Sequence, residues 1–224
     1  MIDNKFIEHS IHDGIGVSFS IESKVFDKKS NYQHVQVFKT TRFVFLMVIE
    51  GMVMLTSKDN FLYHEVLTHP GFIYHPKAES IAIIGGGDCG TLKECLKHEN
   101  VKNITQIEID KVVIDAAKQF FPDLFQASKH PKASIIIDDA VKWIKQAPSK
   151  SLDFLIIDST SPDEISKDLF GEDFFTQCRR VLKDDAIISQ QSESPILHQN
   201  VIDNLKKELN KAGFKFTQNI SFNQ

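Results

Sequence analysis

A glycine-rich run behind a short apolar segment constrains the fold of this chain more than any other feature. Residues 81–84 are all apolar, as in a buried strand, and Gly85, Gly87 and Gly90 then satisfy the spacing G-x-G-x-x-G. A helical pattern follows over residues 91–98. Glycines in such a turn let the backbone approach a ligand closely. The run predicts the strand, turn and helix start of a nucleotide-binding βα unit, although a tight turn without any ligand has the same spacing.

Short apolar strands alternate with helices along most of the chain. Strands are predicted at residues 81–84, 104–109, 134–137, 154–157 and 186–189. Helices are predicted between them at 91–98, 111–120, 139–146 and 172–181, and a further helix around 66–72 precedes the first strand. An amphipathic helix over 196–211 then leads to one last strand over 214–222. This alternation predicts an α/β fold whose mostly parallel sheet is covered by helices on both faces.

Residues 1–60 differ from the rest because they carry strand signals alone. Strands are predicted at residues 17–25, 35–38, 43–49 and 52–55, separated by polar or glycine turns such as 27–31 and 50–51. Such a pattern is typical of a small antiparallel sheet. We therefore expect two domains, an N-terminal β domain over 1–60 and an α/β domain over 61–224.

Composition narrows the classes of function. The chain has 224 residues and a net charge of −4. Its longest apolar run, 43–49, is far short of the roughly 20 residues that cross a bilayer, and the N-terminus shows no signal-peptide core. The cysteines Cys89, Cys95 and Cys178 are odd in number and lack metal-ligand spacing, which is typical of a reducing compartment. We expect a cytoplasmic protein that binds no membrane and, given its mild acidity, no nucleic acid.

Carboxylates follow four successive predicted strands of the α/β domain. They are Asp88, Glu108 with Asp110, Asp138 with Asp139, and Asp158. Ligands of open α/β sheets bind beyond the C-terminal ends of the strands, so these side chains should meet at one edge. Any one of them can instead cap a helix, which is the plain interpretation of Asp110 and of one member of the 138/139 pair. Together they predict a negative site suited to a cationic ligand, to ribose hydroxyls or to an adenine amino group.

Read with their flanking residues, these motifs resemble the spermidine synthase (polyamine aminopropyltransferase) family. The matching segments are Tyr32-Gln33, residues 61–69 (Phe-Leu-Tyr-His-Glu-Val-Leu-Thr-His), 85–88 (Gly-Gly-Gly-Asp), 108–110 (Glu-Ile-Asp), 139–140 (Asp-Ala), 158–160 (Asp-Ser-Thr) and 191–195 (Gln-Ser-Glu-Ser-Pro). The resemblance implies a methyltransferase-like Rossmann domain behind the small β domain, in a homodimer or larger homo-oligomer. The implied reaction moves the aminopropyl group of decarboxylated S-adenosylmethionine, a co-substrate, to putrescine or a similar small amine. The products are spermidine and methylthioadenosine, and no metal or other cofactor is expected.

The resemblance also implies roles for individual residues. Asp158 would be the catalytic base, and Tyr63 would hydrogen-bond the attacking amine. Alkylamines are mostly protonated at neutral pH, so a base beside the nucleophile is chemically required. The implied binding residues are Asp88 for the ammonium end of the aminopropyl group, Glu108 for the ribose, Asp139 with Ala140 for the adenine, Gln33 and His64 around the sulfonium, and Gly85 and Gly87 in the turn.

The chain departs from the family pattern at three places. Ser161 stands where the family normally has an aspartate that holds putrescine, and Met54 where it usually has a glutamine. The chain also ends after one strand of the family's C-terminal hairpin, so we expect an incomplete hairpin with an unpaired sheet edge and self-association. Three functions follow: an aminopropyltransferase, a non-catalytic binder of S-adenosyl compounds or methylthioadenosine, and, less favoured, an S-adenosylmethionine methyltransferase.

Overall fold

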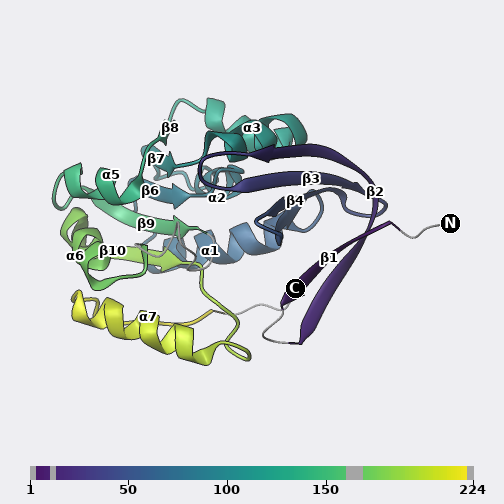
Figure 1. The fold of residues 1–224 in the computed structure, drawn as a ribbon. Coiled ribbons are helices and arrows are strands. Elements are labelled where there is room, and N and C mark those ends of the chain that lie inside the picture. Colours follow the sequence, from purple (N-terminus) through teal and green to yellow (C-terminus); the bar gives the residue numbers. More distant parts are fainter. Residues whose placement is uncertain (1–3, 11–13, 160–168, 221–224) are drawn as a thin grey trace.

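The computed structural model of this protein describes residues 4–10, 14–159 and 169–220, which form two five-stranded sheets (Figure 1). The first sheet is antiparallel, with strand order β1-β2-β3-β4-β5. Its strands are β1 (Lys5–Ser10), β2 (Ile15–Lys29), β3 (His34–Thr40), β4 (Val44–Ile49) and β5 (Met52–Thr56). The predicted antiparallel sheet is confirmed, with β1 as an additional strand that the sequence did not indicate.

The second sheet is parallel and has the order β10-β9-β6-β7-β8. Its strands are β6 (Ser80–Gly85), β7 (Asn103–Glu108), β8 (Ala133–Ile137), β9 (Leu152–Asp158) and β10 (Leu182–Gln190). The helices of the described residues are α1 (Asn60–Tyr74), α2 (Gly90–Cys95), α3 (Lys111–Phe120), α4 (Pro122–Phe125), the short 3₁₀ helix η1 (Gln126–Lys129), α5 (Ala140–Gln146), α6 (Glu172–Val181) and α7 (Gln199–Lys211). The α/β prediction is confirmed, although α2 and α7 are shorter and β10 longer than expected.

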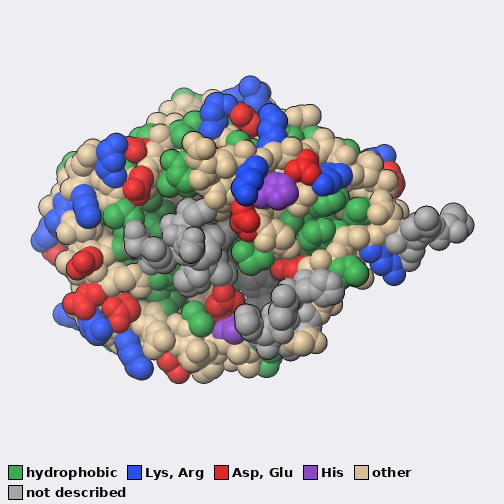
Figure 2. Space-filling model, in the orientation of Figure 1, with side chains coloured by type: hydrophobic (Ala, Val, Ile, Leu, Met, Phe, Trp, Pro, Cys, Tyr) green, Lys and Arg blue, Asp and Glu red, His purple; other side chains and the backbone are tan. Residues whose placement is uncertain are grey.

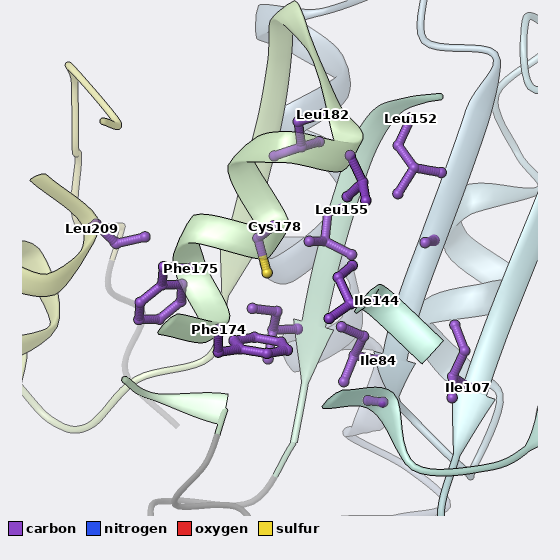
Figure 3. Packing of buried hydrophobic residues seen from close by; sticks show 14 residues of the cluster. Ile84, Ile107, Ile144, Leu152, Leu155, Phe174, Phe175, Cys178, Leu182 and Leu209 are labelled. Carbon is purple, nitrogen blue, oxygen red and sulfur yellow. The ribbon is translucent and has the colours of Figure 1, made fainter. Parts of the chain in front are cut away.

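Alternate side chains of the central strands face opposite helical layers. Ile81 and Ile83 of β6 pack with residues of α1 and α2, whereas Ala82 and Ile84 pack with α5, α6 and α7. Figure 3 shows the second of these clusters, in which Phe174 and Phe175 of α6 fill the space between helix and sheet. Successive side chains of a strand point to opposite faces, so a strand that is apolar throughout must be covered on both. This arrangement explains the unbroken apolar run of β6.

Helix α3 joins the two sheets. Its Phe120 ring makes edge-to-face contacts with Phe26 of β2 and Phe45 of β4. Val113 and Ala117 belong to the same buried cluster, which contains side chains of β3 and β4. In Figure 1 the first sheet accordingly lies over α3, beside the C-terminal ends of the parallel strands. The first sheet thus contributes to the surroundings of that edge.

The prediction of a strand over 214–222 is wrong for residues 214–220, which are the part that the structure describes. Residues 214–220 have no regular secondary structure and do not extend the described sheet beyond its edge strand β10. Phe214 packs against the helical core, but Phe216 is 95% exposed. The Tyr74 hydroxyl of α1 donates a hydrogen bond to Gln218 Oε1 at 2.7 Å. The alternating apolar residues therefore do not share a buried face, which is what a strand here would require.

None of the helices in the described ranges is both long and apolar enough to cross a membrane. The face of the molecule in Figure 2 carries Lys and Arg side chains interspersed with Asp and Glu. Charges of both signs are thus distributed over this face rather than separated into a basic area of the kind that nucleic acid requires.

We predict that Gly71→Ala destabilises the fold, because α1 lies against β9 at this residue. A Cβ on Gly71 would lie 2.2 Å from the Phe154 ring, which is fully buried. Overpacking of this kind costs about 1–3 kcal/mol, measurable as a lower urea midpoint. Lys207→Ala, at an exposed position of α7, is the control and should leave the midpoint nearly unchanged. Equal midpoints for the two variants would contradict the packing described here.

Candidate functional site

The predicted carboxylates lie at one edge of the parallel sheet. Asp158 ends β9, Asp88 lies in the turn after β6, Glu108 ends β7, and Asp138 and Asp139 follow β8. Because β9, β6, β7 and β8 are neighbours in this order, the acidic residues form a row along their C-terminal ends. The spatial expectation drawn from the sequence is therefore met.

Asp158 is held by three hydrogen bonds from separate parts of the chain. Its backbone carbonyl accepts a hydrogen bond from the Gly86 N–H at 2.8 Å. Its Oδ1 accepts from the Tyr63 hydroxyl of α1 at 2.6 Å, and its Oδ2 accepts from the Thr91 hydroxyl of α2 at 2.5 Å. Both carboxylate oxygens are thus engaged before any ligand is bound, which fixes the position and the orientation of the group.

The glycines of the turn are required by the carboxylates that lie next to them. Gly85 and Gly86 have φ values of +81° and +64°, a region that strains other residues. A Cβ on Gly86 would lie 2.8 Å from Asp158 Oδ2, and one on Gly87 would lie 2.8 Å from Glu108 Oε2. The turn can approach both carboxylates only because it lacks side chains at these positions.

Cys89 occupies the turn without taking part in its chemistry. It adopts a left-handed conformation, with φ of 70°, and its side chain is fully buried among apolar residues. Burial, reinforced by the charges of Asp88 and Glu108, raises the pKa of the thiol far above its ordinary value. A thiol that stays protonated is a poor nucleophile, so Cys89 is a packing residue.

The buried His64 of α1 pairs with the partly exposed Asp88 of the turn. His64 is 2% exposed, and its Nε2 lies 3.1 Å from Asp88 Oδ1, which also accepts the Gly90 N–H at 2.6 Å. Burial alone lowers the pKa of His64, but the carboxylates of Asp88 and Asp158 raise it more, and the net shift is upward. A Cβ on Gly90 would lie only 2.0 Å from the His64 ring, so the imidazole can pack here only against a glycine. His64 therefore supports Asp88 from the interior of the protein.

Glu108 is a buried carboxylate whose charge is costly. Its Oε1 accepts the Asp110 N–H at 2.9 Å, and the residue is only 7% exposed. Burial raises the pKa of Glu108 to about 7, and the nearby charges of Asp110, Asp158 and Asp88 add to the effect. A carboxyl group with this pKa changes its charge near neutral pH, which is unusual for a purely structural residue.

Asp110 links the site to the first sheet. Its Oδ1 accepts the Val112 N–H and so caps α3, as predicted, while its Oδ2 accepts the Ser30 hydroxyl at 2.7 Å. Ser30 Oγ in turn accepts the Gln33 N–H at 2.9 Å. Gln33, which is 7% exposed, is thereby held in the loop between β2 and β3, whose Ser30 contacts Asp110 just after β7.

Asp158 and Tyr63 affect each other's ionisation. Burial raises the pKa of Asp158, and the Asp88 charge raises it further, while His64 and the hydroxyls of Thr91 and Tyr63 oppose the shift. Burial and the adjacent Asp158 charge hold the pKa of Tyr63 well above its ordinary value. The phenol consequently remains protonated and donates to the carboxylate.

Asp139 lies further along the same edge. Its Oδ1 accepts the N–H groups of Val141 at 2.7 Å and Lys142 at 3.4 Å, so it caps α5, whose first residue is Ala140. Asp139 itself is exposed, and the neighbouring Asp138 forms an ion pair with Lys142. The structure thus gives Asp139 a capping bond through one oxygen at the end of β8.

Two residues that the sequence singled out have different outcomes. Met54 in β5 is partly buried and packs on the cluster that contains α3, so it belongs to the wall between the sheets. Ser161 lies outside the described residues. Thr91 and Ser30 were not predicted as site residues, and the only signal for Thr91 is its place directly after Gly90, in the first turn of α2.

Two groups of side chains in the described ranges could hold a cation. Their potential ligand atoms lie within 4.8 Å of one another, and the groups are His64 with Asp88 and Asp158, and Glu65 with His69 and Glu94. In the second group the Lys97 ammonium already pairs with Glu94 and lies 3.8 Å from Glu65. In the first group the carboxylates Asp88 and Asp158 border the sheet edge, where an organic ammonium or a metal ion would meet the same negative charge.

Comparison with known proteins gives concordant results along the chain. Residues 6–57 match the family model described as spermidine synthase tetramerisation domain, and residues 60–222 match the spermine/spermidine synthase domain. A polyamine aminopropyltransferase of Alkalilimnicola ehrlichii is 43% identical over 213 residues, which are 95% of this chain and 74% of the relative. One from Methylococcus capsulatus is 41% identical over 219 residues, 98% of this chain and 77% of the relative.

Solved structures agree with these matches. A spermidine synthase in complex with the transition state analogue AdoDATO superposes with a TM-score of 0.90 at 29% identity, covering 95% of this chain and 72% of that one. The spermidine synthase of Thermotoga maritima superposes with a TM-score of 0.88 at the same identity and coverage. Two domain models, relatives above 40% identity and a shared fold lead to one conclusion: this chain belongs to the spermine/spermidine synthase family.

Proposed function

We propose that this protein is an aminopropyltransferase of the spermidine synthase type, which transfers the aminopropyl group of decarboxylated S-adenosylmethionine to putrescine. The observation that carries the proposal is the Asp158 carboxylate, held by two hydroxyl groups beside Asp88 and Glu108 at the ligand-binding edge of the sheet. An amine acceptor needs a base, and a cationic donor needs negative charge near its ammonium and sulfonium groups.

The chemistry of the proposed step is a single displacement. The amine nitrogen attacks the carbon next to the sulfonium, a carbon–nitrogen bond forms, and the carbon–sulfur bond breaks. The sulfur keeps the bonding electron pair and leaves as the neutral thioether of methylthioadenosine. Asp158 accepts the proton that the ammonium must lose before its lone pair can attack. Because the leaving group is neutral, the reaction requires no metal ion to stabilise it.

The remaining site residues are proposed to bind the donor. Glu108 accepts the ribose hydroxyls, Asp139 and Ala140 receive the adenine, and Asp88 binds the ammonium of the aminopropyl group. Gln33 lies near the sulfonium, and His64 contributes through its contact with Asp88. Gly85 and Gly87 supply the close backbone approach.

The partners and the compartment belong to the same proposal. The acceptor is putrescine or a similar small amine. A homo-oligomer, a dimer or larger, would form through the first sheet, since residues 6–57 match a tetramerisation domain. All three cysteines are free and buried, which suits a reducing compartment such as the cytoplasm.

A direct assay separates the three functions. The protein is incubated with decarboxylated S-adenosylmethionine and putrescine, cadaverine or spermidine, and the amines are identified by mass spectrometry. We expect spermidine from putrescine. Binding of methylthioadenosine without any new amine would favour the non-catalytic binder, and methylated products with S-adenosylmethionine would favour the methyltransferase.

Asp158→Asn tests the assignment of the base. The amide cannot accept the proton, and the loss of a general base typically lowers the rate about 10²–10⁴-fold. Methylthioadenosine affinity, measured by calorimetry, should stay nearly unchanged. Asp115→Asn, on the exposed face of α3, is the control and should retain full turnover. Wild-type turnover of Asp158→Asn at saturating substrate would refute this role.

Glu108→Gln should separate stability from ligand binding. The pKa of Glu108 is about 7 in the folded protein, against an ordinary value of 4.5, so the wild type loses stability as the pH rises between these values. The amide carries no charge, so at pH 8 the variant should unfold at a higher temperature, with a gain of up to roughly 3 kcal/mol. This gain should disappear near pH 4.

The same variant should bind methylthioadenosine about tenfold more weakly at pH 8, because a charged hydrogen bond to the ribose is lost. Glu99→Gln removes an exposed carboxylate and should change neither property. Unchanged affinity of Glu108→Gln in calorimetry would show that Glu108 does not contact the nucleoside.

A further inference from the structure

We propose that Thr91 is a positioning residue for the Asp158 carboxylate, whose orientation and ionised state its hydroxyl maintains. The inference rests on the proposed function, in which Asp158 accepts the proton of the amine. Thr91 itself is fully buried, near the start of α2, and touches the carboxylate from the protein side.

The geometry of the two hydroxyl groups carries this inference. Thr91 Oγ1 lies 2.5 Å from Asp158 Oδ2, while the Tyr63 hydroxyl lies 2.6 Å from Oδ1. The donors come from two different helices and contact opposite oxygens, so together they fix the rotation of the carboxylate about its χ2 bond. A helical threonine commonly turns its hydroxyl back to a carbonyl of the preceding turn. Thr91 instead directs it across the sheet edge to a residue far away in the chain.

Counting protons shows what this arrangement leaves for the substrate. Each hydroxyl has one proton, and both protons are given to Asp158. The carboxylate still has unused lone pairs, and so does the Tyr63 oxygen. Two N–H groups of an amine can therefore donate to Asp158 and to Tyr63, which acts as an acceptor here. The nitrogen lone pair then remains free to point at the electrophilic carbon.

The charges around Asp158 make the hydroxyl bonds necessary. The titratable groups that act on it are Tyr63 and His64 of α1, Asp88 of the turn and Glu108 of β7. Burial and the Asp88 charge raise the pKa of Asp158, whereas His64, Thr91 and Tyr63 lower it. Without the Thr91 hydroxyl the carboxyl group would be protonated over a wider range of pH and would fail as a base there.

The test compares Thr91→Val with Thr91→Ser in the full-length protein. Valine preserves the shape and removes the donor, whereas serine retains it. For Thr91→Val we expect the acid limb of the kcat/KM profile to move up by about one pH unit, because that is the order of one hydrogen bond to a charged group. Thr91→Ser should follow the wild type. Thr68→Val alters a fully buried threonine of α1 outside the site and should leave the profile unchanged.

A purely structural role would give a different result. If Thr91→Val lowers the melting temperature but leaves the acid limb in place, the inference is overturned. If the valine variant does not fold, Thr91→Ala removes the same hydroxyl. The acid limb of its kcat/KM profile should then show the same upward shift. Methylthioadenosine affinity should be unchanged in either variant, because Thr91 contacts the base rather than the nucleoside residues.

Two measurements separate failure of this inference from failure of the proposed function. If Asp158→Asn keeps wild-type turnover, the base assignment itself is wrong. If Asp158→Asn is inactive and Thr91→Val has an unshifted limb, only the role of Thr91 is wrong. An NMR titration of the Asp158 carboxyl carbon needs no turnover. The inference requires a higher midpoint in Thr91→Val than in the wild type, and equal midpoints would refute it.

Discussion

The close approach of the glycine turn to two carboxylates is the constraint on which this site depends. A Cβ at Gly86 or Gly87 would lie within 2.8 Å of an oxygen of Asp158 or Glu108, so the ends of β9 and β7 can stand beside the turn only while those positions lack side chains. The Gly86 N–H then holds the backbone of Asp158. The glycine motif therefore has a structural role of its own, because the protein's acidic groups pack directly against it.

The electrostatic consequence is a site that is unfavourable by itself. Asp88, Glu108 and Asp158 influence one another at short range, and burial raises the pKa of Glu108 and Asp158. The groups that relieve this repulsion are mainly hydroxyls, backbone N–H groups and one buried histidine. A cationic ligand would complete the neutralisation, which is how binding energy and specificity can arise from a locally destabilised arrangement.

The sequence predicts the sheet and the row of acids well because both follow from periodicity and topology. Buried parallel strands read as continuous apolar runs, and their C-terminal ends must meet at one edge. It fails at residues 214–220, where alternating aromatic residues suggest a strand but Phe216 remains in solvent. Thr91 could not be found in this way, because the direction of its hydroxyl depends on where the first turn of α2 lies relative to Asp158 at the end of β9. The same holds for the raised pKa of Glu108, which depends on burial that only the tertiary structure provides.

The Ser30 hydroxyl has a consequence for how substitutions in the first sheet are tolerated. The Ser30 hydroxyl donates to Asp110, and the Asp110 N–H donates to Glu108, so the loop between β2 and β3 is connected to the buried Glu108 carboxylate through a single residue. Mutational sensitivity in this protein should follow that connection rather than distance along the chain. A substitution in the loop between β2 and β3 can lower activity, while many substitutions on the solvent-facing side of the same sheet leave activity unchanged.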